Sequence, residues 1–574
     1  MNPVLRYKLR VPLTSFDRLI LHNATVHSFD DAGTVAEAVG FAGGWVTATG
    51  SLDTVRAATP NAEERDLRGA AVYPGFIDAH HHFCFAATYA GFAEVRCPPC
   101  RSLADVLAIV RREAARVPEG EWLVLVGLNE HNLAERRTPD RDELDQAAPR
   151  HPLLLVHFTY HEGVLNSLGL RRAGLDTTRT DPPGGSMGRR RGGEPDGRVA
   201  ERCFGHAEAV ARQALIARDR EGWFAPANAY QQRVLAAGIT HVCDAAVPAS
   251  MEALYREWQR RGELAVGVTM MPLAENMFAV PDPRADGVDP QWRDGRLRRG
   301  PLKLFTDGGT RCAVCITLRD AIRQFAAMLA RSLRARSLTP WRLAAAQPAH
   351  LGPDRRLHTG LLYYDDEALQ ALVRQACGLG HGVGIHAAGN EAVAQALDAL
   401  AAAHRGSRPP RIDHFFFLDA PLLRRAVDLG AHVVVQPIQL RDTGALLRET
   451  GLPPGLVYQA HRQMLDAGLH LAASSDAPVF SFDVRAAIAT AVSRRDAAGG
   501  RLGADQAIGV ADALRMFTRG GAATLGLAGE IGQLTPGARA DAVVMSEDLL
   551  RVPVERLESV GVLATYAGRV VSAP

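Results

Sequence analysis

The chain has 574 residues, of which 47% are hydrophobic and 22% are charged, and its formal net charge is +2. These values are ordinary for a globular protein and allow one large domain with a smaller one. The nearly balanced charge gives no reason to expect a nucleic-acid partner. No apolar run approaches the roughly 20 residues of a membrane helix. Charged residues are scattered through the N-terminus, where a signal peptide would have an apolar segment. We therefore expect a cytoplasmic protein with no nucleic-acid and no membrane partner.

Eight cysteines in a chain of this length do not make a disulfide framework, so reduced thiols are expected. Two pairs have C-x-x-C spacing, Cys97/Cys100 and Cys312/Cys315. The four thiols could bind an additional zinc ion in a tetrahedral site. Ordinary thiols in loops are the alternative, because flanking structure as well as spacing makes such sites.

The two ends of the chain share one sequence pattern. Residues 19–26 and 38–50 read as short strands with a Gly-Gly turn, and residues 541–546 and 562–571 repeat this pattern. We expect residues 1–71 and 530–574 to form a small β-sandwich domain together.

Between these ends, short apolar runs alternate with helical patterns such as residues 391–404. Such alternation predicts an α/β fold with a parallel sheet, and about eight repeats predict closure into a (β/α)8 TIM-type barrel over residues 72–529. The runs begin at Ala71, Trp122, Leu153, Ile239, Leu302, Gly382, Arg411, His432 and Leu469.

An Arg- and Ala-rich insertion over residues 311–356 interrupts the alternation. It contains five apolar residues at helical spacing, which predict an amphipathic helix: Leu318, Ile322, Phe325, Leu329 and Leu333. A lid, a homodimer contact and a plain surface excursion are the open interpretations. Residues 189–191, three arginines in a Gly-rich stretch, are typical of a solvated hairpin tip.

Polar residues gather where the apolar runs end, and this is where a barrel of this type places its catalytic groups. Each residue alone is ambiguous: a single histidine is more often structural, and a single lysine reads as a surface residue. Their recurrence at successive strand ends favours a metal hydrolase site, since imidazole nitrogens and a carboxylate are ligands that zinc prefers. The residues are Asp78, His80, His81, His82, Lys303, Asp307, His386, His414 and Asp476.

Side chains alternate along a strand, so His80 and His82 face the same side and His81 the other. A lysine buried beside a metal would have its ammonium form disfavoured, so Lys303 could be neutral or chemically modified.

At this point the sequence resembles the amidohydrolase superfamily, and within it the N-substituted formamide deformylase-like (exoenzyme regulatory protein-like) branch. The resemblance covers nearly the whole chain. It rests on P-G-F-I-D-A-H-H-H, R-D-E-L-D-Q-A-A-P, H-E-G-V-L-N-S, D-P-P-G-G, L-K-L-F-T-D-G, I-H-A-A-G-N-E-A-V, R-I-D-H, A-S-S-D-A-P-V and E-I-G-Q-L-T-P-G-A-R-A-D. Asn390, where the branch usually has Asp, and Thr159-Tyr160 before His161 depart from the pattern.

The resemblance implies a bound metal, one or two Zn²⁺ ions with other divalent metals as alternatives. His80 and His82 would bind one ion, while His386 and His414 would bind a second ion or share the first. Lys303 would bridge two metals if carboxylated. Asp476 would bind metal and handle protons, and His161 would contact a small-molecule substrate.

From this set we expect a metal-dependent hydrolase that cleaves a non-peptide amide of N-acyl or N-formyl type, with Asp476, His161 and Lys303 as catalytic residues. Deamination, cyclic-amide hydrolysis and metal-assisted C–C cleavage on the same scaffold are alternatives. A barrel that only binds a ligand is the alternative from a different class.

Overall fold

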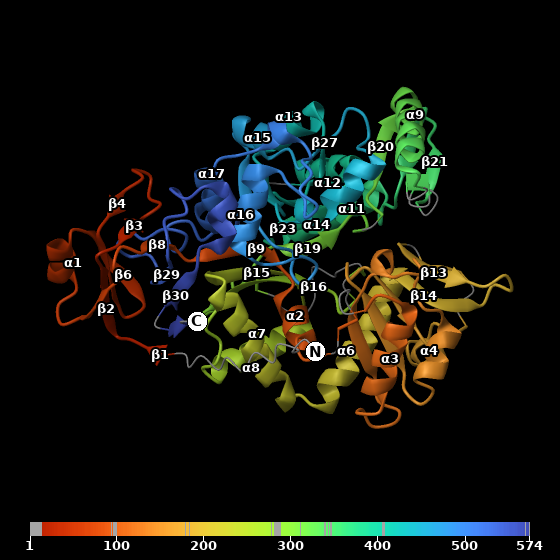
Figure 1. Ribbon diagram of the computed structural model, residues 1–574, viewed down its shortest axis with the longest axis horizontal. Helices are drawn as coiled ribbons and strands as arrows, with labels where there is room; N and C mark the ends of the chain where they lie inside the picture. The colour runs from red at the N-terminus through yellow and green to blue at the C-terminus, as the bar shows by residue number, and fades with distance from the viewer. Residues whose placement is uncertain are drawn as a thin grey trace.

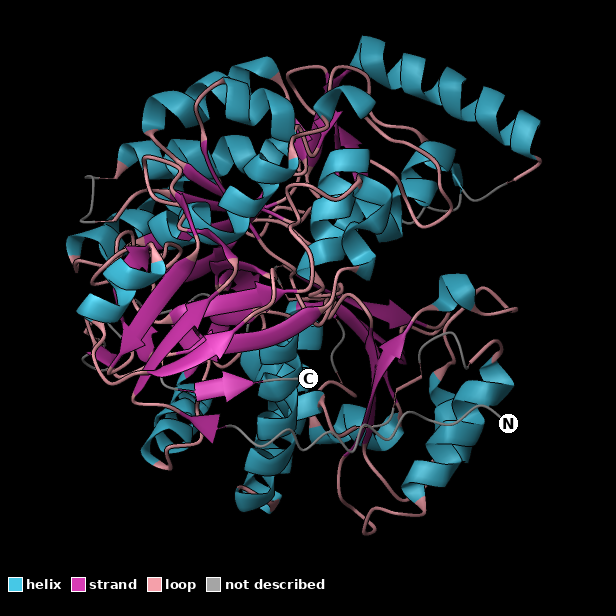
Figure 2. Ribbon diagram, turned by 60° about the vertical axis from the view of Figure 1, so that its left-hand side comes forward, coloured by secondary structure: helices cyan, strands magenta, loops and turns pink. Residues whose placement is uncertain are grey.

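The computed structural model describes residues 14–572 apart from 93, 96–99, 178–179, 183, 277, 280–288, 310, 338–339, 342–343, 345–346, 404–407 and 569. It is an α/β protein in which helices lie outside parallel strands (Figure 2). Among the residues described, no helix combines the length and the apolar character needed to cross a membrane.

The two ends of the described chain build two sheets together, at the left of Figure 1. Their strand orders are β1-β31-β30-β29-β8-β3-β4 and β6-β5-β2-β7. One cluster of buried apolar side chains, including Phe41, Val72 and Tyr566, draws on both sheets and both chain ends. The strands are Thr14–Ser15, Arg18–His22, Thr25–His27, Val35–Ala36, Ala38–Ala42, Trp45–Gly50, Glu63–Asp66 and Ala71–Pro74 for β1–β8, and Asp541–Met545, Val562–Ala567 and Val570–Ser572 for β29–β31; helix α1 is Leu52–Ala58.

Two further sheets contain the parallel strands that follow. Their orders are β17-β18-β16-β15-β9 and β19-β23-β24-β26-β28, parallel except for the β17–β18 pair. The strands are β9 Phe76–His81, β15 Ile239–Pro248, β16 Gly267–Leu273, β17 Arg293–Asp294, β18 Leu297–Arg299, β19 Leu302–Phe305, β23 Val383–Ala387, β24 Arg411–His414, β26 His432–Val435 and β28 His470–Ala473. The helices among them include α2 Phe83–Tyr89, α6 Arg202–Arg218, α7 Phe224–Ala236, α8 Ala249–Arg260, α11 Asp366–Gly378, α12 Asn390–Ala402, α13 Ala420–Leu429, α14 Gln439–Thr450, α15 His461–Asp466, α16 Val484–Ser493 and α17 Val510–Arg515.

Hydrogen bonds join these two sheets at one edge. The Asp476 amide donates to the His80 carbonyl at 2.9 Å, and the His82 amide donates to the Ala477 carbonyl at 2.8 Å. At the other edge the chain itself passes from β18 of the first sheet into β19 of the second, and Gly300 between them donates to Met270 of β16 at 2.6 Å. Among the described residues the strand ladders stay in two sheets, so the expected closed barrel is seen as two parallel sheets that are bonded at one edge and continuous in the chain at the other.

Two of the apolar runs expected in the barrel lie elsewhere. Strands β10 (Leu123–Leu128) and β11 (Leu153–His157) belong to a separate sheet of order β10-β11-β12-β14-β13, with β12 Glu162–Leu165, β13 Gly185–Arg189 and β14 Pro195–Glu201. Figure 1 shows this side sheet in orange and ochre, with α3 (Leu103–Ala114) and α4 (Arg141–Ala147) beside it. The β13–β14 hairpin has residues 190–194 at its tip, as expected for the arginine stretch.

The sequence reading missed β16, which takes a central place among the parallel strands. Its sequence G-V-T-M-M-P-L contains Pro272, and a proline argues against a central strand because it donates no ladder hydrogen bond. The sequence pattern of β16 therefore did not indicate that the whole strand is buried.

The insertion forms β20 (Val314–Thr317), α9 (Leu318–Ala335), β21 (Ala349–Leu351) and β22 (Arg356–Thr359), green at the upper right of Figure 1. Thr317 caps α9 by accepting the Asp320 amide. The predicted amphipathic helix is confirmed, and its apolar stripe is exposed, from 47% at Leu318 to 71% at Leu333. Self-association through this stripe stays a prediction.

Candidate metal centre

The polar residues predicted at strand ends come from both parallel sheets and meet at one end of them. His80 lies in β9, His82 just after it, Lys303 in β19, His386 in β23 and His414 in β24. Asp476 follows β28, the neighbour of β9 across the edge described above. Hence carboxyl ends of parallel strands from distant parts of the chain converge.

Asp476 lies closest to the first histidines. Its Oδ1 is 3.1 Å from His82 Nε2 and 3.4 Å from His80 Nε2. One ligand atom from each of these three residues lies within 4.8 Å of the other two. His81 faces away, as the alternation predicts, with Nδ1 2.9 Å from Asp78 and Nε2 2.8 Å from the Tyr230 hydroxyl.

His414 extends the cluster, with its ring centroid 4.8 Å from that of His80. Its Nδ1 is 2.9 Å from Gln436 Oε1, and Gln436 Nε2 donates to Ser474 at 2.9 Å, which fixes the orientation of the amide. Nδ1 of His414 must therefore carry the proton, leaving Nε2 as a lone-pair donor. That Nε2 is buried and, within the described part of the chain, has no hydrogen-bond partner.

His386 packs against His414 with ring centroids 4.3 Å apart. Its Nε2 is likewise buried without a hydrogen-bond partner among the described residues, 3.5 Å from Asp307 Oδ1. Asp307 accepts the amides of Ala313, Ala388 and Gly389, yet burial raises the pKa of its carboxyl to about 7.

Lys303 lies at the base of the cluster in a buried ion-pair network. Its Nζ is 2.5 Å from Asp413 Oδ2, and Arg411 Nε is 2.7 Å from Asp413 Oδ1. The same Oδ2 lies 3.1 Å from His80 Nδ1, on the far side of that ring from Asp476. Burial would raise the pKa of Asp413, but Arg411 and Lys303 outweigh it and hold this pKa well below its usual range. Burial lowers the pKa of Lys303, against the opposing pull of Asp413.

His161 reaches the cluster from the side sheet, in the turn between β11 and β12, with its ring 5.8 Å from that of His386. Its Nδ1 is 2.8 Å from Glu201 Oε2, and the Tyr363 hydroxyl donates to the same carboxylate. Burial alone would lower the pKa of His161, but the Glu201 carboxylate reverses this and raises it.

Burial favours the neutral, metal-binding form of three histidines of the cluster. Burial lowers the pKa of His82 and of His386, and it lowers the pKa of His414 to about 3. Asp476 stays ionised because its contacts with His80 and His82 outweigh burial, which would raise its pKa. Neutral imidazoles with unsatisfied buried nitrogens around a carboxylate fit a divalent cation, since such nitrogens are otherwise costly to bury.

Two residues of the cluster have backbone conformations that side chains rarely adopt. The φ angle is 82° at His414 and 58° at Asp476. Such conformations cost on the order of 1–3 kcal/mol each and persist where the surroundings enforce them, which is common at functional sites.

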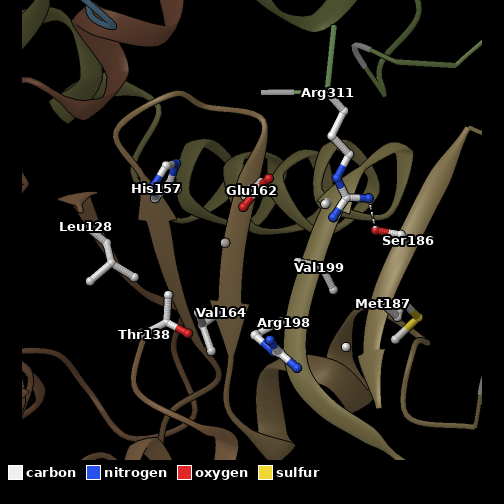
Figure 3. Close-up of a pocket in the computed structure, with 13 residues that line it drawn as sticks. Leu128, Thr138, His157, Glu162, Val164, Ser186, Met187, Arg198, Val199 and Arg311 are labelled. Atoms are coloured by element: carbon white, nitrogen blue, oxygen red, sulfur yellow. Dashed lines mark hydrogen bonds between the residues drawn. The ribbon is translucent and has the colours of Figure 1, made fainter. Parts of the chain in front are cut away.

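A cavity of about 200 Å³ lies on the face of the side sheet (Figure 3). Its lining includes Glu162 and Ala200, which are the chain neighbours of His161 and Glu201, while His161 and Glu201 themselves are not part of the lining. Arg311 enters from the loop after β19 and donates to Ser186 at 2.6 Å.

Sequence reasoning missed the supporting residues Arg411, Asp413, Gln436, Glu201 and Tyr363. One signal was available for Asp413, because a buried lysine needs a nearby counter-charge and R-I-D-H holds an acid beside His414. Cys97 lies outside the described residues, and Cys100 is buried. Cys315 groups with Asp354 and His358, so the four-thiol zinc site has no support among the described residues.

The model of the amidohydrolase family matches residues 63–572. The chain belongs to the amidohydrolase family. This amidohydrolase is 28% identical over 568 residues to N-substituted formamide deformylase of Arthrobacter pascens, covering 97% of this chain and 99% of that protein. It is 24% identical to the putative amidohydrolase YtcJ of Bacillus subtilis (strain 168), covering 92% and 94%.

The fold is shared with a solved structure, an uncharacterised metal-dependent hydrolase of Pyrococcus horikoshii OT3. The TM-score is 0.70 at 21% identity, covering 94% of this chain and 99% of that one. These findings confirm the resemblance read from the sequence motifs and the expectation of an enzyme, a metal-dependent hydrolase of this family.

The Asp413 network yields a stability prediction. Asp413→Asn should lower the free energy of unfolding by about 3–5 kcal/mol, because Arg411 and Lys303 are left buried without their counter-charge. Asp398→Asn is the matched control, since Asp398 is 61% exposed and pairs with Arg425 at the surface. Urea unfolding followed by fluorescence would compare the two. Equal midpoints for both variants would show that the network does not stabilise the fold.

Proposed function

We propose that this chain hydrolyses the C–N bond of a non-peptide amide of N-acyl or N-formyl type. The observation that carries the proposal is the set of imidazoles gathered around Asp476, with one buried nitrogen each of His386 and His414 lacking a hydrogen-bond partner among the described residues. Support for the bond type comes from the similarity, over nearly the full length, to a protein named N-substituted formamide deformylase.

In this proposal a single divalent ion, zinc by the chemistry of the donors, is held by His80, His82 and Asp476, with His386 and His414 facing it. Such an ion supplies Lewis acidity, which makes a water nucleophilic at neutral pH and polarises a carbonyl group. Gln436 fixes the tautomer of His414, and Asp413 faces the outer nitrogen of His80. Both contacts orient ligands, as residues behind metal ligands generally do.

Asp476 is the proposed general base. A carboxylate accepts the proton of the attacking water, and the C–O bond forms as the carbonyl becomes tetrahedral. The same group then returns the proton to the nitrogen as the C–N bond breaks, so amide and water give a carboxylic acid and an amine. Asp476 is ionised and lies at the cluster, as this role requires.

His161 is the proposed hydrogen-bond donor to the substrate oxygen. With Nδ1 facing Glu201, which raises its pKa, the ring can present a protonated Nε2 towards the cluster. A donor aimed at developing negative charge is among the strongest catalytic contributions in acyl transfer.

Replacing Asp476 by Asn should lower kcat about 10²–10⁴-fold, the range for loss of a positioned acid–base group, while the purified protein keeps its metal. Asp466→Asn makes the same change at an exposed position and should leave kcat unchanged. The assay would follow formate and amine release from N-substituted formamides. Release of ammonia, or near wild-type turnover of Asp476→Asn, would contradict the proposed reaction or base.

For Lys303 we propose the ammonium form that pairs with Asp413, in place of the carboxylated form that would bridge two metals. Burial lowers the pKa of Lys303, but the 2.5 Å contact with the negatively charged Asp413 opposes this and supports the ammonium form. The carboxylated form would place a second anion against Asp413.

This assignment predicts that protein prepared in ¹³C-bicarbonate shows no carbamate carbon signal by NMR. A carbamate signal that disappears in Lys303→Ala would instead establish carboxylation and favour two metals. Arg408→Ala, which removes another cation near these strands, would serve as the control for nonspecific loss of signal.

The cavity of Figure 3 is the proposed site for the substituent of the substrate, since Arg311 reaches it from the loop after β19 and its lining includes the chain neighbours of His161 and Glu201. Arg311→Ala should raise KM about tenfold or more for substrates with a polar substituent and leave kcat nearly unchanged. For the smallest substrate, N-methylformamide, KM should not change. Arg323→Ala, at an exposed site of α9, is the control. Equal effects on both substrates would exclude the cavity as this subsite.

We also propose how the sheets combine into domains. The two parallel sheets would act as one (β/α)8 barrel with the side sheet inserted after β9, and the two sheets of the chain ends as a β-sandwich. The hydrogen bonds between β9 and the residues after β28, the passage of the chain from β18 into β19, and the shared apolar cluster of the end sheets support this division at about residues 71 and 530.

A further inference from the structure

A second group of metal-ligand side chains lies in the insertion, away from the catalytic cluster. Cys315, Asp354 and His358 each offer one ligand atom, and these three atoms lie within 4.8 Å of one another. Cys315 Sγ is 3.9 Å from His358 Nε2, and Asp354 Oδ1 is 3.2 Å from the same nitrogen.

The strand register places these residues together. Cys315 of β20 is the direct cross-strand partner of His358 in β22, and His358 is the direct partner of His350 in β21. Directly opposed residues share one face of a sheet, so the three side chains form a row across it. The imidazoles of His350 and His358 are stacked with centroids 5.1 Å apart, so His350 is the nearest further donor.

His358 is oriented as metal-binding histidines usually are. Its Nδ1 is 2.7 Å from Glu391 Oε1, a residue in the first turn of α12. A carboxylate on one ring nitrogen fixes the proton there and leaves the other nitrogen as a donor. Nε2, the other nitrogen, faces Cys315 and Asp354. Burial would lower the pKa of His358, but its contacts with Glu391 and Asp354 raise it, so a bound metal would replace the proton on Nε2.

The base of this group is held firmly against the parallel-sheet region. Asn390 accepts the Cys315 amide at 3.0 Å and donates to the Cys315 carbonyl at 2.8 Å. This two-point contact explains the departure at Asn390, since an aspartate could not donate to the carbonyl. Burial raises the pKa of Cys315, and Arg356 opposes this, because its Nε donates to Cys315 Sγ at 2.9 Å and such a bond favours the thiolate that a metal requires.

We propose that Cys315, Asp354 and His358 form a second, structural zinc site, with His350 stacked beside it. Sulfur, imidazole nitrogen and a carboxylate oxygen are zinc ligands, while magnesium and calcium prefer oxygen alone. The ion ties β20 to β22 on either side of α9 and fixes the base of the insertion. The proposal does not depend on the reaction assigned to the catalytic cluster.

Cobalt separates the two sites, because thiolate ligands alone give an intense near-ultraviolet charge-transfer absorption with Co²⁺ and the catalytic cluster contains no cysteine. Metal-depleted full-length protein would be titrated with Co²⁺. We expect the thiolate band to saturate by two equivalents, one for each site, in the wild type and in Cys312→Ser, the matched control. It should be absent in Cys315→Ser, which should bind one equivalent less while keeping the visible absorption of the catalytic ion.

His358→Asn is a second test in case Cys315→Ser misfolds, because this variant keeps the thiol of Cys315. The apparent affinity for Co²⁺, measured from the thiolate band, should fall at least tenfold, and the far-ultraviolet circular dichroism spectrum should not change. Absence of the band in the wild type, or its survival in Cys315→Ser, would overturn the proposal and leave the Cys315–Arg356 pair as an ordinary polar contact.

Discussion

The buried carboxylate of Asp413 is the constraint on which the centre of this molecule depends. It holds Lys303 and Arg411 in positions where neither cation reaches water, and it faces the outer nitrogen of His80. Burying two cations and one anion costs several kcal/mol per ion unless each has a partner. Asp413 meets this requirement through both of its oxygens, so the strands carrying these residues are held in one register.

Two histidines of the centre have a hydrogen-bond partner on their outer side, and two present a nitrogen without a partner among the described residues. Gln436 holds one nitrogen of His414, and Glu201 holds one nitrogen of His161. On the inner side, His386 and His414 present bare nitrogens within a region where burial keeps both rings neutral. A protein core does not retain such an arrangement for packing alone, because unsatisfied buried polar atoms lower stability.

Much of this could be predicted from the chain itself, for a physical reason. Parallel strands end at one edge, so the residues that follow each apolar run must meet, and His80, His386, His414 and Asp476 could be grouped without coordinates. The residues that hydrogen-bond these histidines could not be predicted. Gln436 and Glu201 are distant in sequence from most of the cluster, and polar residues of their kind are common. The assignment of strands to the barrel was wrong where packing overrides the sequence pattern. Strand β16 was missed because it contains a proline, and β10 and β11 have the apolar pattern of barrel strands but pair in the side sheet.

The pairing of β29–β31 with strands from the other end of the chain affects how the polypeptide matures on the ribosome. Strand β8 finds its neighbour β29 only after nearly all of the protein has been translated. At roughly 5–20 residues per second, that interval lasts on the order of half a minute or more. Until then the early strands expose an unpaired edge and half of an apolar core, which is the condition that chaperones recognise in nascent chains.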